Sequence, residues 1–284
     1  MSIQEVWETT GIRCTRGVSM GNDQKAMHIH MVYEIYMPQN PGVKCFVNDR
    51  IYELEPGDVM LFTDEDLHKA GVPADVRYDR YVITFPPQLL RGTPCEELLQ
   101  CFDGQGGVRQ PRLHLDAAQR EAFITLIEEL RTETEGGIPV PAGQWLALCR
   151  LLLFLCRLRQ QSPSPPAAEK QALHPQIRKV LAYIDDNFRQ PIPLETLSEL
   201  CFLDRHYLCR LFKRQTGFCI HDYITYRRLA CAAALLREGK SVSEAAGLSG
   251  FGSDTFFITT FKKNVGVTPY RYACRCRPET ADTP

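Results

Sequence analysis

The stretch GFGSDTFFITTFKKNVGVTPYRY, from Gly250 to Tyr272, decides the fold of the carboxy-terminal part of this 284-residue chain. Ser253 offers an acceptor to the amide groups that a helix start leaves free, and Gly266 is a typical helix end. Between them, helical spacing predicts an inward face made of Phe257, Thr260 and Phe261. The stretch therefore predicts a short helix whose other face is turned outward.

The same pattern occurs once earlier in the chain. Leu211-Phe212-Lys213 with Gly217 returns 49 residues later as Thr260-Phe261-Lys262 with Gly266. In the first copy we predict a helix over about 194–201 and a second helix that begins after the N-cap Asp204. The inward residues of that second helix are predicted to be Leu208, Leu211 and Phe212. Each copy thus has a short helix, a turn and a second helix, which is the helix-turn-helix layout.

The outward faces of the two second helices are the candidate DNA contacts. In the first copy these residues are Arg205, His206, Cys209, Arg210 and Lys213. In the second copy they are Ser253, Asp254, Thr255, Ile258, Thr259 and Lys262. Arg210 is suited to a guanine edge or a phosphate, and His206 to a base acceptor or a thymine methyl, whereas lysines suit the phosphate backbone. The second copy has fewer strong base-reading side chains, so we expect the first copy to carry more of the specificity.

Residues 175–273 resemble the DNA-binding domain of the AraC/XylS family of bacterial regulators, most clearly in the stretch that ends at Tyr272. The resemblance implies two helix-turn-helix subdomains joined by a long helix, here about 221–237, which presents both recognition helices to successive major grooves. Thr259 takes a place that arginine often holds in the family, which implies weaker binding by the second subdomain. The predicted DNA-binding domain is 174–276.

Charge is distributed unevenly along the chain. The net charge is −1, but residues 174–277 hold 16 Lys and Arg against 9 Asp and Glu, and the remainder holds 17 against 25. A basic excess confined to one domain fits a nucleic-acid binder. The chain start lacks the features of a signal peptide, and the most apolar stretch, 146–158, is shorter than the roughly 20 residues that span a bilayer. We therefore expect a soluble, cytoplasmic protein without membrane association, whose 12 cysteines are reduced thiols.

Residues 1–159 predict a β-rich domain that ends in two helices. Between 28 and about 87, runs such as VYEIYM and DVMLFT alternate with Pro-Gly turns, which indicates a sandwich or barrel. Helices are expected over about 116–135, with an aspartate cap, and over about 142–159. The second helix is apolar on more than one face, which indicates a partner subunit, with ordinary packing inside the domain as the alternative. Residues 160–173, rich in Pro, Ser, Gln and Ala, predict a linker.

Polar residues in the β region are similar to the histidine motifs of cupin barrels. They are His28, His30, Glu34 and His68, and the first three occupy even positions on one presumed strand, so they face the same side. The resemblance implies a sensor barrel, whose cavity we expect Tyr36 and Arg80 to line as well. Three histidines and one carboxylate form a set that binds divalent transition metals. The preferred alternative is a cavity without a cofactor, in which these groups hydrogen-bond a sugar or another small effector.

These features predict a two-domain α+β protein: an amino-terminal cupin-like β-barrel with a helical dimerisation hairpin, and a carboxy-terminal all-α domain with two helix-turn-helix units. The resemblance implies a homodimeric transcription regulator rather than an enzyme. It would bind double-stranded promoter DNA, respond to a small-molecule effector such as a carbohydrate, and recruit RNA polymerase as an activator. Two alternatives remain open: a metal-dependent cupin enzyme, and an effector-independent regulator whose barrel only dimerises.

Overall fold

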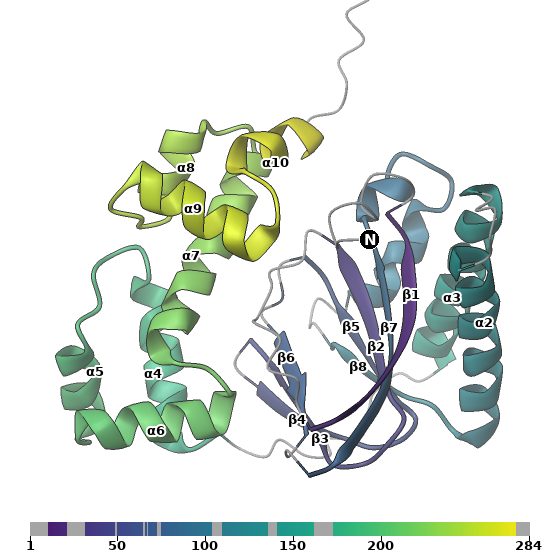
Figure 1. The fold of residues 1–284 in the computed structure, drawn as a ribbon, viewed down its shortest axis with the longest axis horizontal. Coiled ribbons are helices and arrows are strands. Elements are labelled where there is room, and N and C mark those ends of the chain that lie inside the picture. The colour runs from purple at the N-terminus through teal and green to yellow at the C-terminus, as the bar shows by residue number, and fades with distance from the viewer. Residues whose placement is uncertain are drawn as a thin grey trace, which may run out of the picture.

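The chain has an amino-terminal part built on β-sheets and a carboxy-terminal part built from helices (Figure 1). The computed structural model describes residues 11–21, 32–48, 50–64, 66, 68–72, 75–103, 110–135, 141–161 and 173–276. Most of the predicted linker, residues 160–173, lies outside this part. His28 and His30 lie outside it too.

Two antiparallel sheets form the β part. The strands are β1 (Arg13–Met20), β2 (Tyr33–Pro38), β3 (Val43–Val47), β4 (Arg50–Leu54), β5 (Asp58–Phe62), β6 (His68–Gly71), β7 (Arg77–Phe85) and β8 (Arg112–His114). One sheet has the order β1-β7-β2-β5-β8 and the other has the order β4-β3-β6. Within the described residues no strand pairing joins the two sheets, so the predicted barrel takes the form of two facing sheets rather than a closed cylinder.

Successive side chains of a strand point to opposite faces of a sheet. In the five-stranded sheet, both of these faces carry apolar side chains. Ile35, Leu61 and Ile83 belong to a core shared with the following helices. Tyr36 and Met60, one position along from the first two, belong to a second core shared with the three-stranded sheet. The space between the sheets is therefore a separate interior, and it receives the even-numbered residues of β2.

Two helices, α2 (Ala117–Glu135) and α3 (Pro141–Gln161), cover the outer face of the five-stranded sheet (Figure 1). As predicted, Asp116 caps α2, since its Oδ1 accepts a hydrogen bond from the Gln119 amide at 2.8 Å. Between β7 and β8 lie two short 3-10 segments, η1 (Pro87–Leu89) and η2 (Glu96–Phe102).

Helix α3 buries most of its leucines in the core of its own domain. The fully buried ones are Leu148, Leu151, Leu152 and Leu155. Leu146 and Leu153 are instead 57% and 39% exposed. Ordinary packing inside the domain thus accounts for most of the apolar character of this helix. Leu146 and Leu153 are the leucines of α3 that remain exposed to contact another surface.

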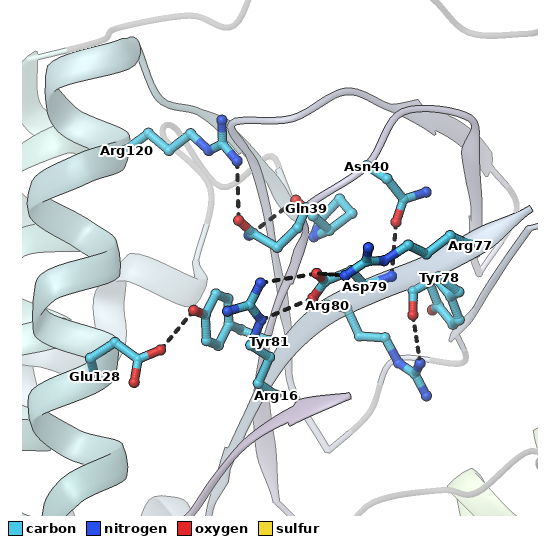
Figure 2. A network of polar contacts seen from close by, with 11 residues as sticks. Arg16, Gln39, Asn40, Arg77, Tyr78, Asp79, Arg80, Tyr81, Arg120 and Glu128 are labelled. Atoms are coloured by element: carbon cyan, nitrogen blue, oxygen red, sulfur yellow. Dashed lines mark hydrogen bonds and ion pairs between the residues drawn. The ribbon is translucent and has the colours of Figure 1, made fainter. Parts of the chain in front are cut away.

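A polar network fastens α2 to the β1 edge of the five-stranded sheet (Figure 2). Arg16 on β1 donates to both carboxylate oxygens of Asp79 on β7, at 3.1 and 3.0 Å. These bonds hold the pKa of Asp79 below its ordinary value. On the helix side, the Tyr81 hydroxyl donates to Oε1 of Glu128 at 2.7 Å. The network joins three elements that are distant in sequence, and no local pattern predicts it.

The carboxy-terminal part contains both predicted helix-turn-helix units. Its helices are α4 (Pro175–Asn187), α5 (Leu194–Cys201), α6 (Arg205–Thr216), α7 (Ile220–Arg237), α8 (Val242–Leu248), α9 (Asp254–Val265) and α10 (Pro269–Cys276). The first unit is α5 with α6, and the second is α8 with α9. The helix predicted over 194–201 has these bounds in the structure, and the long helix predicted over 221–237 begins one residue earlier.

Asp58 is a fully buried carboxylate at the start of β5. Its oxygens accept hydrogen bonds from Arg112 Nε at 2.9 Å and from the Glu55 amide at 2.7 Å, and they lie 2.9 Å from His114 Nδ1. Both basic side chains come from β8. The aspartate therefore holds the turn before β5 and fixes β8 at the sheet edge.

We expect Asp58→Ala to lower the free energy of unfolding by about 3 kcal/mol, because it removes a fully buried acceptor that binds Arg112 and the Glu55 amide. Denaturant titration measures the change. The matched control is Glu53→Ala, which removes an exposed carboxylate paired with Lys44 at 3.0 Å and should change stability by less than about 1 kcal/mol. Equal effects of the two substitutions would contradict the structural role of Asp58.

Candidate nucleic-acid interface and effector pocket

Helix α6 has the fixed ends and the two-faced character expected of a recognition helix. Asp204 Oδ1 accepts from the amides of His206 and Tyr207, at 2.9 and 3.1 Å, so the predicted N-cap is present. Gly217 ends the helix in the left-handed region, with φ of 80°. As predicted, the buried face holds Leu208, Leu211 and Phe212. The opposite face is thereby held outward.

The outward face of α6 is basic. His206, Arg210 and Lys213 are exposed, whereas Cys209 is half-buried. Arg205 is exposed but forms an ion pair with Glu195 of α5, so its positive charge is partly neutralised within the first helix-turn-helix unit. Cys209, Arg210 and Lys213 line one wall of a cavity of about 410 Å³, and residues of α7 such as Ile220 and Ile224 line the other. Tyr207, at 43% exposure, is an outward residue that the sequence analysis missed.

Helix α9 is less basic on its outward face. Ser253 accepts from the Phe256 amide at 3.4 Å, as the predicted cap requires. The predicted outward residues Asp254, Thr255, Ile258, Thr259 and Lys262 are all exposed, as is Ser253. The Thr259 hydroxyl donates to the carbonyl of Thr255 at 2.9 Å, so it is already bonded within the helix. Thr260, predicted to point inward, is only half-buried.

The end of α4 holds the two helix-turn-helix units in one arrangement. Arg228 on α7 donates to the carbonyls of Phe188 and Gln190, at 2.7 and 2.9 Å. Gly250, in the turn between α8 and α9, has φ of 86°, and a Cβ at this position would overlap the backbone of Arg189. One short segment after α4 is thus clamped between the connecting helix and the turn of the second unit.

The candidate effector site is a buried polar cluster between the two sheets. Glu34 of β2 and His68 of β6 form a buried pair, with 3.6 Å between His68 Nε2 and Glu34 Oε2. His68 stacks on the Phe62 ring at 3.7 Å between centroids. The Tyr36 hydroxyl lies 2.9 Å from that of Tyr78, a residue that the sequence analysis missed although it shares its strand face with Arg80.

Electrostatics in the pocket favour a polar ligand. Burial lowers the pKa of His68, but its interaction with Glu34 more than offsets this, so the pKa lies above its ordinary value. Burial raises the pKa of Tyr36 well above its ordinary value, so this hydroxyl stays protonated. Arg80 lies over the Tyr78 ring at 4.1 Å and donates to Ser19 Oγ at 3.0 Å. The cluster thus offers ionic and hydroxyl groups among apolar side chains.

The proposed metal set cannot be assembled from the described residues. Glu34 and His68 are brought together, but the other two members, His28 and His30, lie outside the described part of the chain. Among residues that the structure describes, no group of three or more His, Cys, Asp or Glu side chains has the geometry of a metal site.

Comparison with known proteins matches both halves. Residues 22–135 match the family model for an AraC-like ligand binding domain, and residues 197–275 match a helix-turn-helix domain model. The chain is 26% identical over 254 residues to the HTH-type transcriptional activator RhaR of Enterobacter sp. (strain 638), which covers 89% of this chain and 88% of that protein. It is 23% identical over 253 residues to RhaR of Escherichia coli O1:K1 / APEC, covering 88% and 87%. The C-terminal domain of AraT, a response regulator from Geobacillus stearothermophilus, matches 40% of this chain and 95% of its own at 31% identity, with a TM-score of 0.36.

A ligand-binding domain placed ahead of two helix-turn-helix units defines a DNA-binding transcription regulator under effector control. The chain belongs to the AraC family of regulators. The matched models and relatives are those of regulators, which sets aside the cupin-enzyme alternative. Of the helices in the described residues, none is long and apolar enough to cross a membrane.

We expect Gly250→Ala to destabilise the protein by about 3 kcal/mol, because alanine is strained at positive φ and its Cβ would meet the Arg189 backbone. The matched control is Gly252→Ala, two positions along, where a Cβ meets nothing within 4 Å. It should cost less than about 0.5 kcal/mol. Thermal unfolding monitored by circular dichroism compares the two, and a tolerated Gly250→Ala would show that the clamp is not needed.

Proposed function

We propose that the protein is a transcription activator whose recognition helices α6 and α9 enter two successive major grooves on one face of promoter DNA. The observation that carries this proposal is the pair of outward, exposed helix faces held in one arrangement by α7 and the clamped end of α4. Major grooves on one face of B-DNA recur about every 34–36 Å. The operator should therefore contain two elements about one helical turn apart.

Helix α6 supplies more of the sequence specificity in this proposal. Arg210 and His206 are exposed and able to reach base edges, while Lys213 positions the helix on the phosphates. On α9, Asp254 disfavours phosphate, and the Thr259 hydroxyl is already bonded to its own helix. The second unit then contributes mostly affinity, through Lys262 and through contacts with thymine methyl groups at Ile258.

The effector is a small polar molecule, with a carbohydrate as the first class to test. Glu34, His68 and the Tyr36–Tyr78 hydroxyl pair offer donors and acceptors inside a buried space, and polyhydroxylated ligands match such a set. No resident cofactor is needed for this role. The relatives are described as transcriptional activators, which supports activation and recruitment of RNA polymerase by this chain.

We further propose a cytoplasmic homodimer formed through α3. Leu146 and Leu153 are seven residues apart and exposed, so they lie on one side of that helix. Pairing of α3 with its copy would bury them. A regulator that responds to no effector, with the sensor domain used only for dimerisation, remains the second candidate because of this apolar surface.

Arg210→Ala should weaken binding to the selected operator by about 1–3 kcal/mol while leaving binding to scrambled DNA nearly unchanged. Lys262→Ala should weaken binding to both DNAs equally. It should also reduce the slope of log affinity against log salt concentration by about 1, which corresponds to one phosphate contact. The operator is first selected from genomic fragments at physiological salt, and fluorescence anisotropy then gives the affinities. An unchanged specificity ratio for Arg210→Ala would refute base reading by this residue.

A carbohydrate panel should contain a ligand that stabilises the protein against thermal unfolding. At 100 times its dissociation constant, such a ligand adds about 2.7 kcal/mol. His68→Gln should abolish the shift because it removes the imidazole partner of Glu34, whereas the distant Glu53→Ala should keep it. If no carbohydrate or other metabolite shifts the unfolding temperature, the effector-independent candidate is favoured.

A further inference from the structure

Four cysteines lie in two pairs where the segment η2 packs against α3. Cys95 and Cys101 stand near the two ends of η2, and Cys149 and Cys156 are seven positions apart on one side of α3. The thiol of Cys149 interacts with that of Cys95, and the thiol of Cys156 interacts with that of Cys101. Two segments that are distant in the sequence are therefore matched, cysteine to cysteine, along one contact.

The pair of Cys101 and Cys156 is buried, and hydrogen bonds hold its two segments together. Cys101 is fully buried and Cys156 is 5% exposed. Cys156 Sγ donates to the carbonyl of Leu98 at 3.3 Å, and Arg159 Nε, about one turn further along α3, donates to the carbonyl of Cys101 at 2.8 Å. A disulfide forms readily where the backbone already keeps two cysteines close together. These two bonds provide that support beside both thiols.

The two thiols of this buried pair differ in how easily they ionise. The thiol and the backbone amide of Cys101, together with the charge of Arg159, hold the pKa of Cys156 below its ordinary value, although burial and Glu97 oppose this. Burial raises the pKa of the Cys101 thiol well above its ordinary value. Cys156 is therefore the sulfur that attacks as a thiolate, and Cys101 keeps its proton until a reactive partner has formed beside it.

The pair of Cys95 and Cys149 lacks this activation. Both residues are half-buried. Burial, with a further contribution from Cys95, raises the pKa of Cys149 to about 12, so this thiol stays protonated near neutral pH. A protonated thiol is a poor nucleophile. The second pair therefore resembles the first in its position between η2 and α3 but not in its reactivity, and it serves as an internal control.

A structural metal site is the other common use of closely spaced cysteines. Such a site takes four ligands. Within the described residues, no third His, Cys, Asp or Glu side chain joins either pair in a metal-binding arrangement. Cys101 and Cys156 therefore fit a bond between their own two sulfurs better than a shared ion. Disulfides in a reducing cytoplasm are usually transient and respond to oxidants.

We propose that Cys156 and Cys101 form an oxidation site for hydrogen peroxide, at which a reversible disulfide joins η2 to α3. The Cys156 thiolate attacks one peroxide oxygen, so the O–O bond breaks, a sulfenic acid forms and hydroxide leaves. The Cys101 thiol then attacks that sulfur, an S–S bond replaces the S–O bond, and a second hydroxide leaves. The two thiol protons convert both hydroxides to water. The two thiols thereby lose two electrons, and the peroxide gains them.

The disulfide gives the sensor domain an input that is separate from the effector site. It closes a loop of chain that contains β8, α2 and most of α3. Because a cross-link restricts the unfolded chain, the oxidised protein should unfold at a temperature about 5–15 °C higher than the reduced protein. Helix α3 also carries Leu146 and Leu153, so oxidation fixes the helix that is proposed to form the homodimer.

The test starts from the reduced full-length protein. It is treated with hydrogen peroxide, its remaining thiols are blocked with iodoacetamide, and its digest is analysed by mass spectrometry. We expect a peptide pair linked through Cys101 and Cys156, which dithiothreitol separates again. In Cys101→Ser the reaction should stop at the sulfenic acid of Cys156, which dimedone labels. The matched control is Cys149→Ser, about two turns earlier on α3, which should keep both the link and the rise in unfolding temperature.

The proposal is overturned if no link between Cys101 and Cys156 forms at a peroxide dose that oxidises the exposed Cys219 and Cys274. It is also overturned if Cys156→Ser still shows the rise in unfolding temperature, or if dimedone labels no sulfenic acid at Cys156 in Cys101→Ser. If Cys156→Ser does not fold, the link in the unsubstituted protein and the dimedone label decide. None of these measurements uses DNA or an effector, so their outcome is independent of the proposed function.

Discussion

The position of α7 is the constraint on which the rest of the structure depends. This 18-residue helix, about 27 Å long, carries one helix-turn-helix unit at each end. Two recognition helices bind successive grooves only if their separation matches the DNA repeat, so whatever bends or tilts α7 changes binding at both sites together. Arg228 holds one side of the helix to the end of α4, and Phe46 packs on the Phe218–Tyr223 side at its start. A sensor that acts on this helix needs no contact with DNA.

Local signals made the helical domain predictable. The carboxylate of Asp204 and the left-handed glycine at 217 mark the two ends of α6 by their own chemistry, so its bounds follow from a few residues. Period-two alternation likewise predicted that Glu34 shares one strand face with His28 and His30, and of these three residues the structure describes Glu34. It was harder to predict what buries α3, because an apolar helix face does not show whether the same chain or a second copy covers it. The structure covers most of it from within.

Contacts between distant segments could not be predicted in this way. The ion pair of Arg205 with Glu195 of another helix reduces one candidate DNA contact, and it depends on side-chain positions rather than on spacing. Which strands of the described residues pair could not be predicted either, because alternation specifies which side a residue faces but not which strands pair at the edges. The pairing of Asp64 with Arg237 spans 173 positions, far beyond any periodic pattern.

The composition of the interdomain interface suits a reversible contact. A large apolar interface would fix the domains permanently, whereas interfaces between mobile domains are more polar and rely on a few buried groups. Here Phe46 supplies apolar burial, and hydrogen bonds and one ion pair surround it. Breaking a mostly buried ion pair is costly unless both charges regain water, and Asp64 and Arg237 would both do so if the domains separated. Separating the two domains then costs far less free energy than removing Asp64 or Arg237 alone. Under this condition the docked and separated arrangements are close in free energy, and a ligand of modest affinity can shift the equilibrium between them.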